Sequence, residues 1–540
     1  MGNVLSLYQL LGSVAGVLIL YGVFKFAQLQ YNQWTSPICD LPGPKSPSWL
    51  WGNIREIWSD EHSALQEKWV EQYGLTIKYK GFLGMTQLYT MDPKAIGHIL
   101  MNNQEYQKPD HLRYILNQVV GSGLLVVEGE KHKQQRRAMN PAFGAAQIRE
   151  LTEIFIDKSI ELRDAWTIEI AKHGGIGKVE ALGWLSKTTL NIIGLAGFNY
   201  DFDNLGGAPK PNDFNEAFSL VLKAGTRSVL VFLRAVFPPL RLLPTVRRAK
   251  VRKAQATIAQ VGNKLLQESK ARGLDPEQAA KKRRDVLSLL VRANMSKDIP
   301  ESQKMSDEDV LAQVPTFLIA GHETTSNATT WTLYALCRDQ EIQKKLREEL
   351  ISVPTENPTM DELNALPYLD FVVRETMRLH TPQVSTFRIA TRDDVLPLSK
   401  PFTDKQGRVQ EGLSIRKGQA LTIPILALNR AKWIWGEDAA EFRPERWASV
   451  PEAAMAIPGV WGNMMSFLGG PRACIGYRFA LVEMKALLFT LIRSFEFELA
   501  VPVEEVTKHT TIMQRPVLKS DPKGGNQMPL LIRSVSQSWM

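Results

Sequence analysis

A glycine-rich loop with one cysteine, placed directly before a long apolar helix, is the feature that most narrows the folds open to this chain. The loop runs from Phe467 to Gly476, and the helical pattern follows over Tyr477–Phe495. A cysteine at the start of a helix meets unpaired backbone N–H groups and the positive end of the helix dipole, which favour its thiolate form. Because the thiolate is the form that ligates iron, the pattern predicts that Cys474 binds a metal.

The neighbours of Cys474 indicate a flat bound group. Gly469, Gly470 and Gly476 have no side chains, so such a group can approach the backbone closely and the loop can adopt turn conformations. Arg472 lies two residues before the cysteine and can pair with a carboxylate. The alternative, a hydrolytic cysteine, would need a histidine base and leaves the spacing of the glycines and the arginine unexplained.

A second polar motif interrupts an apolar helix earlier in the chain. The helix is expected to begin near Ser306, whose spacing from Asp309 is typical of an N-terminal cap, and it contains the segment Ala320–Thr325. An acid and two hydroxyls are unfavourable in the middle of a buried helix. Thr324 has two interpretations: its hydroxyl bonds back to a carbonyl one turn earlier, the usual arrangement in helices, or it serves chemistry together with Glu323.

The composition describes a globular chain with an apolar N-terminus. Of 540 residues, 44% are hydrophobic, which is enough for a large core, and the formal net charge is +9. No basic and aromatic stripe or zinc-finger spacing supports nucleic-acid binding. Three cysteines cannot form a disulfide framework and favour a reducing compartment.

The run Val4–Phe24 has no charged residue and is about as long as one bilayer crossing. We interpret it as a transmembrane anchor rather than a cleaved signal peptide, because a basic segment before it is missing and the apolar run is long. Basic residues follow the run, so the body is expected in the cytosol. The predicted domains are an anchor over 1–30, a proline-rich hinge over 31–48 and a catalytic domain over 49–540.

Within the catalytic domain, helical periodicity dominates after a short β-hairpin. Leu75–Lys80 and Met85–Met91 are the predicted strands, joined by a turn with Gly81 and Gly84. The segment Val229–Pro244 is apolar but interrupted by two prolines, which leaves an interfacial membrane segment and a buried helix pair as equal alternatives. The fold class is mainly α with a small β-sheet domain near the N-terminus.

With these residues in view, the chain is identified as resembling the cytochrome P-450 family. Phe467–Gly476 matches every fixed position of that family's haem-binding signature, F-x-x-G-x-R-x-C-x-G. Ala320–Thr325 resembles its oxygen-activation motif, and Glu375-x-x-Arg378 followed by Phe442–Trp447 resembles its structural motifs, in the family's order. The resemblance extends over nearly the whole chain and is closest to membrane-bound fungal members that modify terpenoids.

The resemblance implies a role for each matched residue. Cys474 would be the axial ligand of haem (heme b), with Phe467 beside the sulfur and Gly470 and Gly476 next to the ring. Glu323 and Thr324 would deliver protons to oxygen. Glu375, Arg378 and Arg443 would form a structural triad.

The resemblance also implies three contacts to the haem propionates besides Arg472. Arg136 and Arg388 keep the family's arginines, whereas His132 stands where the family has tryptophan, although an imidazole can still donate a hydrogen bond. Lys131, Lys133 and Arg137 form either part of a docking face for an acidic reductase or a solvated helix.

The function implied is insertion of one oxygen atom from O2 into a lipophilic small molecule, with electrons from a separate NADPH-cytochrome reductase at the endoplasmic reticulum membrane. A tri- or sesquiterpenoid is the expected substrate, and fatty or aromatic compounds are the alternative. The rival functions are haem-thiolate isomerisation or dehydration, and a haem sensor. Apolar candidates for the substrate pocket, each of which could instead be core, are Ile115, Leu116, Leu125, Phe317, Val384, Phe387 and Ile512.

Overall fold

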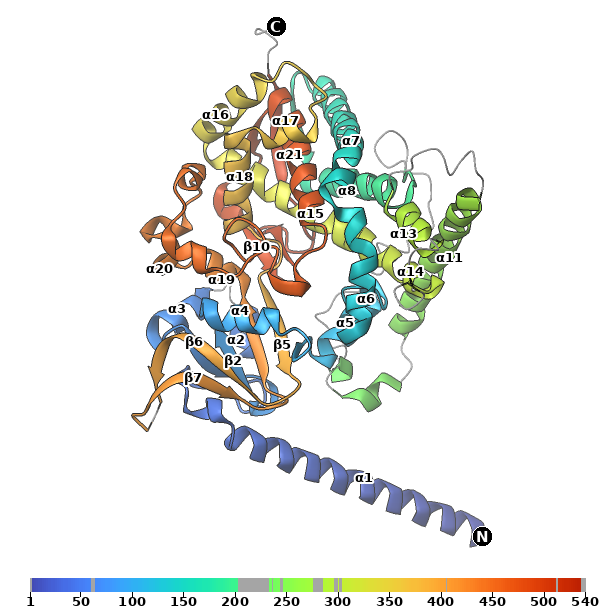
Figure 1. Ribbon diagram of the computed structural model, residues 1–540, viewed down its shortest axis with the longest axis vertical. Helices are drawn as coiled ribbons and strands as arrows, with labels where there is room; N and C mark the ends of the chain where they lie inside the picture. Colours follow the sequence, from blue (N-terminus) through green and yellow to red (C-terminus); the bar gives the residue numbers. More distant parts are fainter. Residues whose placement is uncertain are drawn as a thin grey trace. The chain divides into compact units, whose positions relative to one another are not determined.

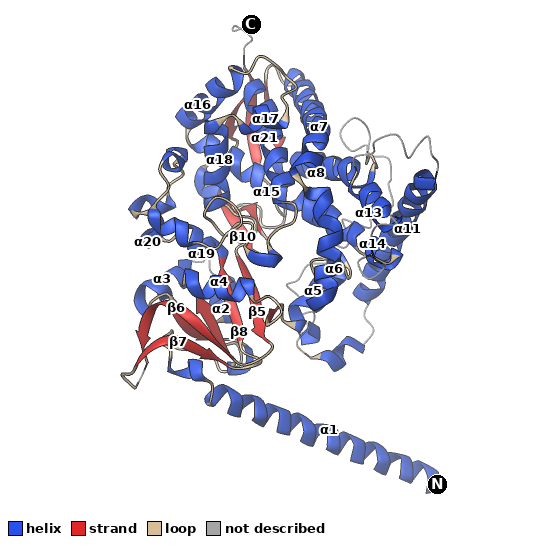
Figure 2. Ribbon diagram, viewed as in Figure 1, coloured by secondary structure: helices blue, strands red, loops and turns tan. Residues whose placement is uncertain are grey.

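The computed structural model describes residues 2–59, 64–202, 233–235, 237–242, 246–274, 285–295, 300, 304–404, 406–510 and 513–535. The pocket candidate Ile512 lies outside these residues, as do residues 229–232, 236, 243 and 244 of the apolar segment Val229–Pro244. Contacts divide the chain into a first unit, Met1–Gln107 with Thr386–Pro424, and a second unit, Lys108–Ser385 with Ile425–Met540. Figure 1 colours both units along the chain, and Figure 2 shows that helices dominate and the strands form small sheets. The mainly α class with small sheets is therefore confirmed.

The first unit contains the predicted hairpin. Strands β1 (Thr76–Lys80) and β2 (Thr86–Thr90) pair antiparallel, with Ile77 opposite Tyr89, and their alternate side chains Ile77 and Leu88 are fully buried. The sheet continues in the order β1-β2-β8-β5-β3 through strands from much later in the sequence. The remaining elements of the unit are α1 (Gly2–Trp34), α2 (Ile54–Ser59), α3 (Ala64–Tyr73), α4 (Pro93–Met101), β3 (Tyr106–Gln107), β5 (Ser385–Ala390), β6 (Asp394–Thr403), β7 (Val409–Ile415) and β8 (Ala420–Pro424).

Helix α1 covers the predicted anchor and continues four residues beyond its predicted end at residue 30. When the helices of the described part of the chain are judged by length and hydropathy together, none qualifies as a membrane crossing.

The second unit is a helical body with two small sheets. Its helices are α5 (Asp110–Val120), α6 (Gly129–Met139), α7 (Ala145–Lys172), α8 (Ala181–Phe198), α11 (Val246–Leu274), α13 (Val286–Met295), α14 (Asp307–Leu311), α15 (Gln313–Arg338), α16 (Gln340–Ile351), α17 (Met360–Asn364), α18 (Pro367–Leu379), α19 (Ile425–Asn429), α20 (Lys432–Trp435) and α21 (Tyr477–Ser494). Its strands are β4 (Ile176–Glu180), β9 (Phe495–Leu499), β10 (Val506–Thr510), β11 (Gln514–Leu518) and β12 (Pro529–Ser534). Strand β12 pairs between β4 and β9, and β10 with β11 forms a hairpin.

Helix α15 runs through the core of this unit, where it packs against α8, α18 and α21. The expected helix start is correct in place, because the Ser306 hydroxyl accepts the Asp309 N–H at 3.1 Å. The single helix predicted from there is two helices, α14 and α15, that meet at Ala312. Pro315 explains the division: its ring conflicts with the carbonyl four residues earlier, so it is tolerated only in the first turn of a new helix.

Candidate active site

The cysteine loop is held in a fixed shape by backbone hydrogen bonds. The Cys474 N–H donates to the Phe467 carbonyl at 2.9 Å, and the Ala480 N–H donates to the Gly476 carbonyl at 2.9 Å as α21 begins. Gly470 has φ +67°, a left-handed conformation that side chains disfavour. This geometry confirms the turn predicted between the loop and the helix and places Cys474 just before the N-terminus of α21.

The thiol of Cys474 is exposed, although it lies in the body of the second unit. Burial nevertheless raises its pKa, against the opposing effects of the Gly476 N–H and the positive charge of Arg136. The chain alone therefore does not produce the expected thiolate, and a cation at the sulfur would supply the missing stabilisation.

Gly476 gives an independent indication that a group belongs beside the sulfur. Its φ is −92°, which any residue adopts, and a Cβ there would meet only the Phe143 ring, at 3.8 Å. Nothing described around this position requires glycine. A flat ligand that lies against the backbone would require it.

A cluster of cations lies beside the loop. Arg136 on α6 donates to the Ala473 carbonyl at 2.5 Å, and Arg472 donates to the Val127 carbonyl at 2.8 Å and pairs with Glu128. Burial and the charges of Arg136 and Arg113 lower the pKa of Arg472, against the effect of Glu128. We call Arg113, Arg136 and Arg472, with Lys108, the cationic cluster.

His132 is buried at the edge of the cationic cluster. Burial, with the charges of Arg472, Lys108 and Arg136, lowers the pKa of His132 to about 3. Its imidazole is therefore neutral at physiological pH and has one N–H to donate. The structure thus brings Arg136, Arg472 and His132 together, as the motifs predicted.

Arg388, the fourth residue expected at the propionates, belongs to the first unit. It lies on β5, where its guanidinium donates to the Thr386 hydroxyl at 2.7 Å and to the Phe387 carbonyl at 2.8 Å. Its contact with a propionate stays a prediction.

The second predicted motif, Ala320–Thr325, is the most accessible part of the interior of α15. Ala320 is exposed and Gly321, Glu323 and Thr324 are partly exposed, while nearly every other residue of the helix is buried. The Thr324 hydroxyl donates to the Ala320 carbonyl at 2.7 Å, the back-bonded arrangement expected of a helical threonine. A Cβ on Gly321 would lie 2.7 Å from the Ile193 side chain, so this glycine permits α8 to pack closely on α15.

The Glu323 carboxylate lies between two basic side chains, His322 and Arg515, that the sequence did not predict as its partners. Its carboxylate pairs with Arg515 of β11, and the His322 Nε2 lies 3.4 Å from its Oε1. Burial raises the pKa of Glu323, but His322 and Arg515 outweigh it and lower the pKa to about 2. Glu323 is therefore ionised and holds no proton of its own at neutral pH.

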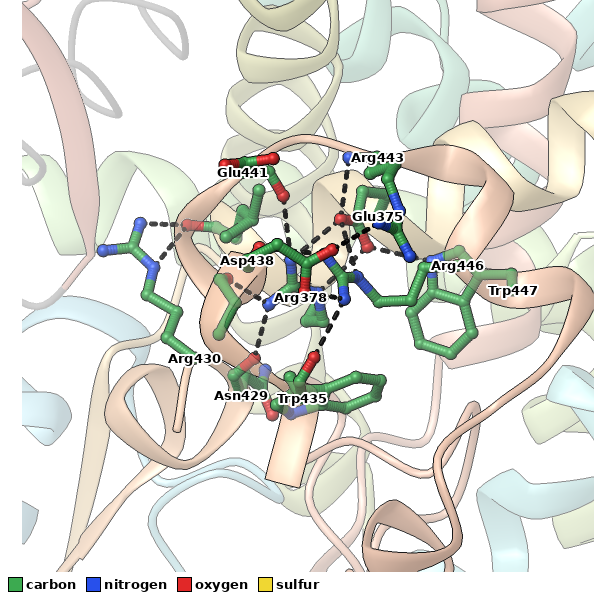
Figure 3. A network of polar contacts seen from close by, with 12 residues as sticks. Glu375, Arg378, Asn429, Arg430, Trp435, Asp438, Glu441, Arg443, Arg446 and Trp447 are labelled. Atoms are coloured by element: carbon green, nitrogen blue, oxygen red, sulfur yellow. Dashed lines mark hydrogen bonds and ion pairs between the residues drawn. The ribbon is translucent and has the colours of Figure 1, made fainter. Parts of the chain in front are cut away.

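Arg378 is fully buried and forms the centre of a polar network (Figure 3). Two of its nitrogens donate to Glu375, at 2.8 and 2.9 Å. The guanidinium also reaches carbonyls of Asn429, Ala439 and Glu441 at 2.6 to 3.1 Å. Every nitrogen of the guanidinium is satisfied within the chain, which gives the Glu375–Arg378 pair a structural role.

The prediction of Arg443 as the third member of the triad was wrong. The Arg443 side chain points away from Glu375 to Asp438, at 2.7 Å, and is 55% exposed, so only its backbone N–H reaches the Glu375 carboxylate. Arg446 takes the place instead: its Nε lies 3.4 Å from Glu375 and its side chain is 3% exposed. Arg446 lies in the 3-10 turn that starts at Pro444, and that turn directs its side chain inward.

Comparison with known proteins agrees with this geometry. The family model of cytochrome P450 matches residues 42–521. Cytochrome P450 monooxygenase 205 of Postia placenta is 56% identical over 92% of this chain and 93% of its own length. Cytochrome P450 monooxygenase 128 of the same fungus is 49% identical over 98% of both chains, and cytochrome P450 monooxygenase claO of Ampulloclitocybe clavipes is 36% identical over 92% of this chain and 93% of its own. The chain belongs to the cytochrome P450 family.

Cytochromes P450 bind haem iron through a cysteine thiolate, and the residues of this P450 fit that group. An accessible thiol beside a glycine that no neighbour requires suits the iron and the porphyrin plane. The cationic cluster suits the propionates because it concentrates charges that repel one another.

Several residues of this cytochrome P450 were not predicted. Lys108 belongs to the cationic cluster, and Glu128 pairs with both Lys108 and Arg472. Arg515 holds Glu323, and Glu483 of α21 is fully buried near Thr325. Glu128 directly precedes the basic helix and could have been found from its position. Arg515 lies nearly two hundred residues from Glu323, so no local pattern indicated it.

Proposed function

We propose that this cytochrome P450 is a haem-dependent monooxygenase that inserts one oxygen atom from O2 into a lipophilic small molecule, with Cys474 as the axial ligand of the iron. The observation that supports this most is that Cys474 is accessible just before the N-terminus of α21, with Arg136 bound to the carbonyl of the residue before it. Bound haem supplies the oxidising chemistry, and the thiolate donates electron density that favours O–O cleavage.

The chain's own part of the reaction is to order protons. Thr324 presents its hydroxyl on the accessible stretch of α15 and can pass a proton by exchanging its bond to the Ala320 carbonyl. Glu323 is ionised, so it would orient a water molecule rather than act as the first donor. Buried neighbours on α15, such as Phe317 and Leu318, keep bulk water away.

The proposed substrate is a terpenoid, with a tri- or sesquiterpenoid skeleton. An apolar wall favours a lipophilic molecule. In the second unit, the candidates Leu116 and Phe317 are buried, Ile115 and Val384 are half-buried, and Leu125 is 39% exposed. Fatty or aromatic compounds are the alternative class to be tested.

We further propose that the protein is anchored in the endoplasmic reticulum membrane by its N-terminal helix, with a cytosolic body, and receives electrons from an NADPH-cytochrome reductase. The uncharged run Val4–Phe24 supports the anchor, and exposed apolar side chains on α1, among them Leu20, Val23 and Phe24, need a nonaqueous partner.

The test begins with the full chain expressed with ample haem. Reduced under carbon monoxide, it is expected to absorb at about 450 nm, as thiolate-ligated haem does, and Cys474→Ser should abolish this band. Cys337→Ser is the matched control, because that thiol is largely enclosed on α15 and its pKa is raised by burial. An unchanged spectrum in Cys474→Ser would refute the assignment.

Activity is then measured with a reductase in a yeast that makes terpenoids. A monooxygenase consumes NADPH and O2 and leaves an oxygen atom from labelled O2 in the product. Product formed without NADPH or O2 would instead identify an isomerase or dehydratase.

A further inference from the structure

The cysteine loop is backed by a second segment, Pro458–Met464, folded tightly against it. The Val460 N–H donates to the Leu468 carbonyl at 2.8 Å. A Cβ on Gly469 would lie 1.7 Å from the Pro458 carbonyl oxygen, so the two backbones touch where that side chain would be. The segment is therefore part of the support for the loop that presents Cys474.

An aromatic contact joins this segment to Phe467, the first residue of the cysteine loop. The Trp461 ring meets the Phe467 ring edge to face, with centroids 5.6 Å apart and planes at 70°. Tyr477 contacts Phe467 from α21 at 6.0 Å. Edge-to-face pairs of this kind contribute about 0.5–1.5 kcal/mol beyond their buried area. Phe467 is thereby held in one orientation, and its carbonyl accepts the Cys474 N–H.

Trp461 is in turn held by a cation. The Arg374 guanidinium lies 5.2 Å from the Trp461 ring and 5.7 Å from the Trp447 ring. Arg374 Nε also donates to Asp370 at 2.5 Å, and Asp370 pairs with Lys485 of α21 at 2.9 Å. Arg374 is on α18, most of whose residues are buried, so the contacts connect Trp461 to a helix of the core.

The far end of the stack reaches the structural network of Figure 3. The Trp447 indole N–H donates to Glu375 at 3.0 Å. A continuous series of contacts therefore runs from Glu375 through Trp447, Arg374 and Trp461 to Phe467. We call Arg374, Trp461 and Phe467 the proximal stack.

We infer that Trp461 and Arg374 are positioning residues for the haem thiolate: through the proximal stack they fix Phe467 against Cys474 and so keep water from the sulfur. This rests on the proposed role of Cys474. Water that hydrogen-bonds a ligating thiolate reduces its donation to iron, which favours the reduced metal and raises the potential. A chain without the stack would still fold around its core but hold a more positive potential.

The experiment compares the equilibrium reduction potential and the reduced carbon monoxide spectrum of the full-length holoenzyme with those of four variants. Trp461→Leu removes the aromatic contact, and its potential should shift to a more positive value, with severalfold faster loss of the band at about 450 nm. Trp461→Phe keeps a ring and should recover at least half of that shift. Arg374→Met removes the cation and keeps the apolar stem, so it should shift the potential the same way by less. Trp433→Leu is the control, because that tryptophan is 44% exposed on α20.

The outcomes separate this inference from the proposed function. If the unaltered protein gives no thiolate band, the role of Cys474 fails. If it gives the band while Trp461→Leu binds haem with unchanged potential and spectrum, or shifts no more than Trp433→Leu, the inference is overturned and Trp461 is only a packing residue. Should Trp461→Leu fail to bind haem, Arg374→Met decides by the same criterion.

Discussion

Two buried arginines of the second unit are satisfied in different ways. Arg378 and its partner Glu375 are both 0% exposed, and the rest of the guanidinium bonds to backbone carbonyls. Arg472 and its partner Glu128 are almost as buried, at 5% and 7%, but here burial lowers the pKa of Arg472, and the charges of Arg136 and Arg113 lower it further, against the effect of Glu128.

The difference separates a structural network from a binding site. A buried charge with all its hydrogen bonds made inside the chain stabilises only the fold in which they are made. In the cationic cluster, Arg113, Arg136, Arg472 and Lys108 outnumber the carboxylate of Glu128, so part of their repulsion remains until a further anion binds. Burial and charge are alike in the two regions. They differ in whether the partners within the chain satisfy the buried charges.

Removal of Glu375 should have the largest effect, because it breaks the complete network. Glu375→Ala leaves the Arg378 guanidinium buried without a carboxylate and leaves Arg446 with Asp438 alone, which costs about 3–5 kcal/mol. We expect little folded protein and no haem band, measured by thermal unfolding and by the yield of holoenzyme. Glu496→Ala, a similar deletion at a partly exposed pair, is the control, and equal losses in both would contradict the distinction.

Removal of Arg472 should spare the fold and weaken haem binding. A hydrogen bond to a charged partner contributes about 1.5–3 kcal/mol, so Arg472→Gln should release haem to apomyoglobin at least about tenfold faster. Because this change also leaves Glu128 unpaired, the double variant Arg472→Gln/Glu128→Gln is needed. Fast release in the double variant assigns the arginine to the haem, whereas normal release would mean that it serves only Glu128.

Sequence alone predicted the parts of the site that lie in one continuous segment. Cys474, the glycines and Arg472 stand within one ten-residue motif, although the partners that hold Arg472, Val127 and Glu128, come from elsewhere in the chain. The hairpin at Thr76–Thr90 follows from alternating burial and glycine turns. Of the residues brought together across the fold, Arg136 and His132 were expected beside the loop only because of the family resemblance, and Arg515 was not expected at all. Arg515 meets Glu323 only because the β10-β11 hairpin packs near α15, as the Asn327 side-chain bond to the Gln514 carbonyl also shows.

Two errors have local physical causes. One helix was expected from Ser306, and Pro315 divides it. Arg443 was chosen for the triad, yet it lies before the turn at Pro444, and only a residue inside that turn, Arg446, faces Glu375. A spacing of three residues along an irregular segment does not define which side chain points inward.

Glu483 is as fully buried as Glu375, but among the described residues it has no cation beside it to satisfy its charge. Glu483 is 0% exposed, and neither of its carboxyl oxygens has a hydrogen-bond partner in the described part of the chain. Burial raises its pKa well above the ordinary value, against an opposing effect of Thr325. The unfolded chain loses this proton near pH ~4.3 and the folded chain keeps it, so the stabilisation is complete below that pH. It is lost as pH rises through the folded pKa.

Glu483→Gln should therefore make the protein more stable at neutral and alkaline pH. Each tenfold difference in proton affinity between the folded and the unfolded chain corresponds to about 1.4 kcal/mol, and the unfolding midpoint should depend less on pH above about pH 5. Thermal unfolding of the holoenzyme from about pH 5 to pH 9 measures the change. A variant as pH-dependent as the parent would show that the carboxyl finds a partner in the folded state.

The smallest effect is expected at Arg443, and it tests which arginine belongs to the complete network. Arg443→Ala keeps the backbone N–H that reaches Glu375 and loses only an exposed pair with Asp438, so stability should fall by less than about 1 kcal/mol. Arg446→Ala removes a buried side chain that bonds Glu375, Asp438 and the Trp435 carbonyl, and it should cost several times more. The two are compared by the unfolding midpoint of the holoenzyme, and equal losses would restore Arg443 to the triad. Both arginines lie on the same short segment, but the Arg443 side chain is largely exposed and that of Arg446 is buried among its partners. The difference between the two losses of stability therefore measures what those buried partners contribute.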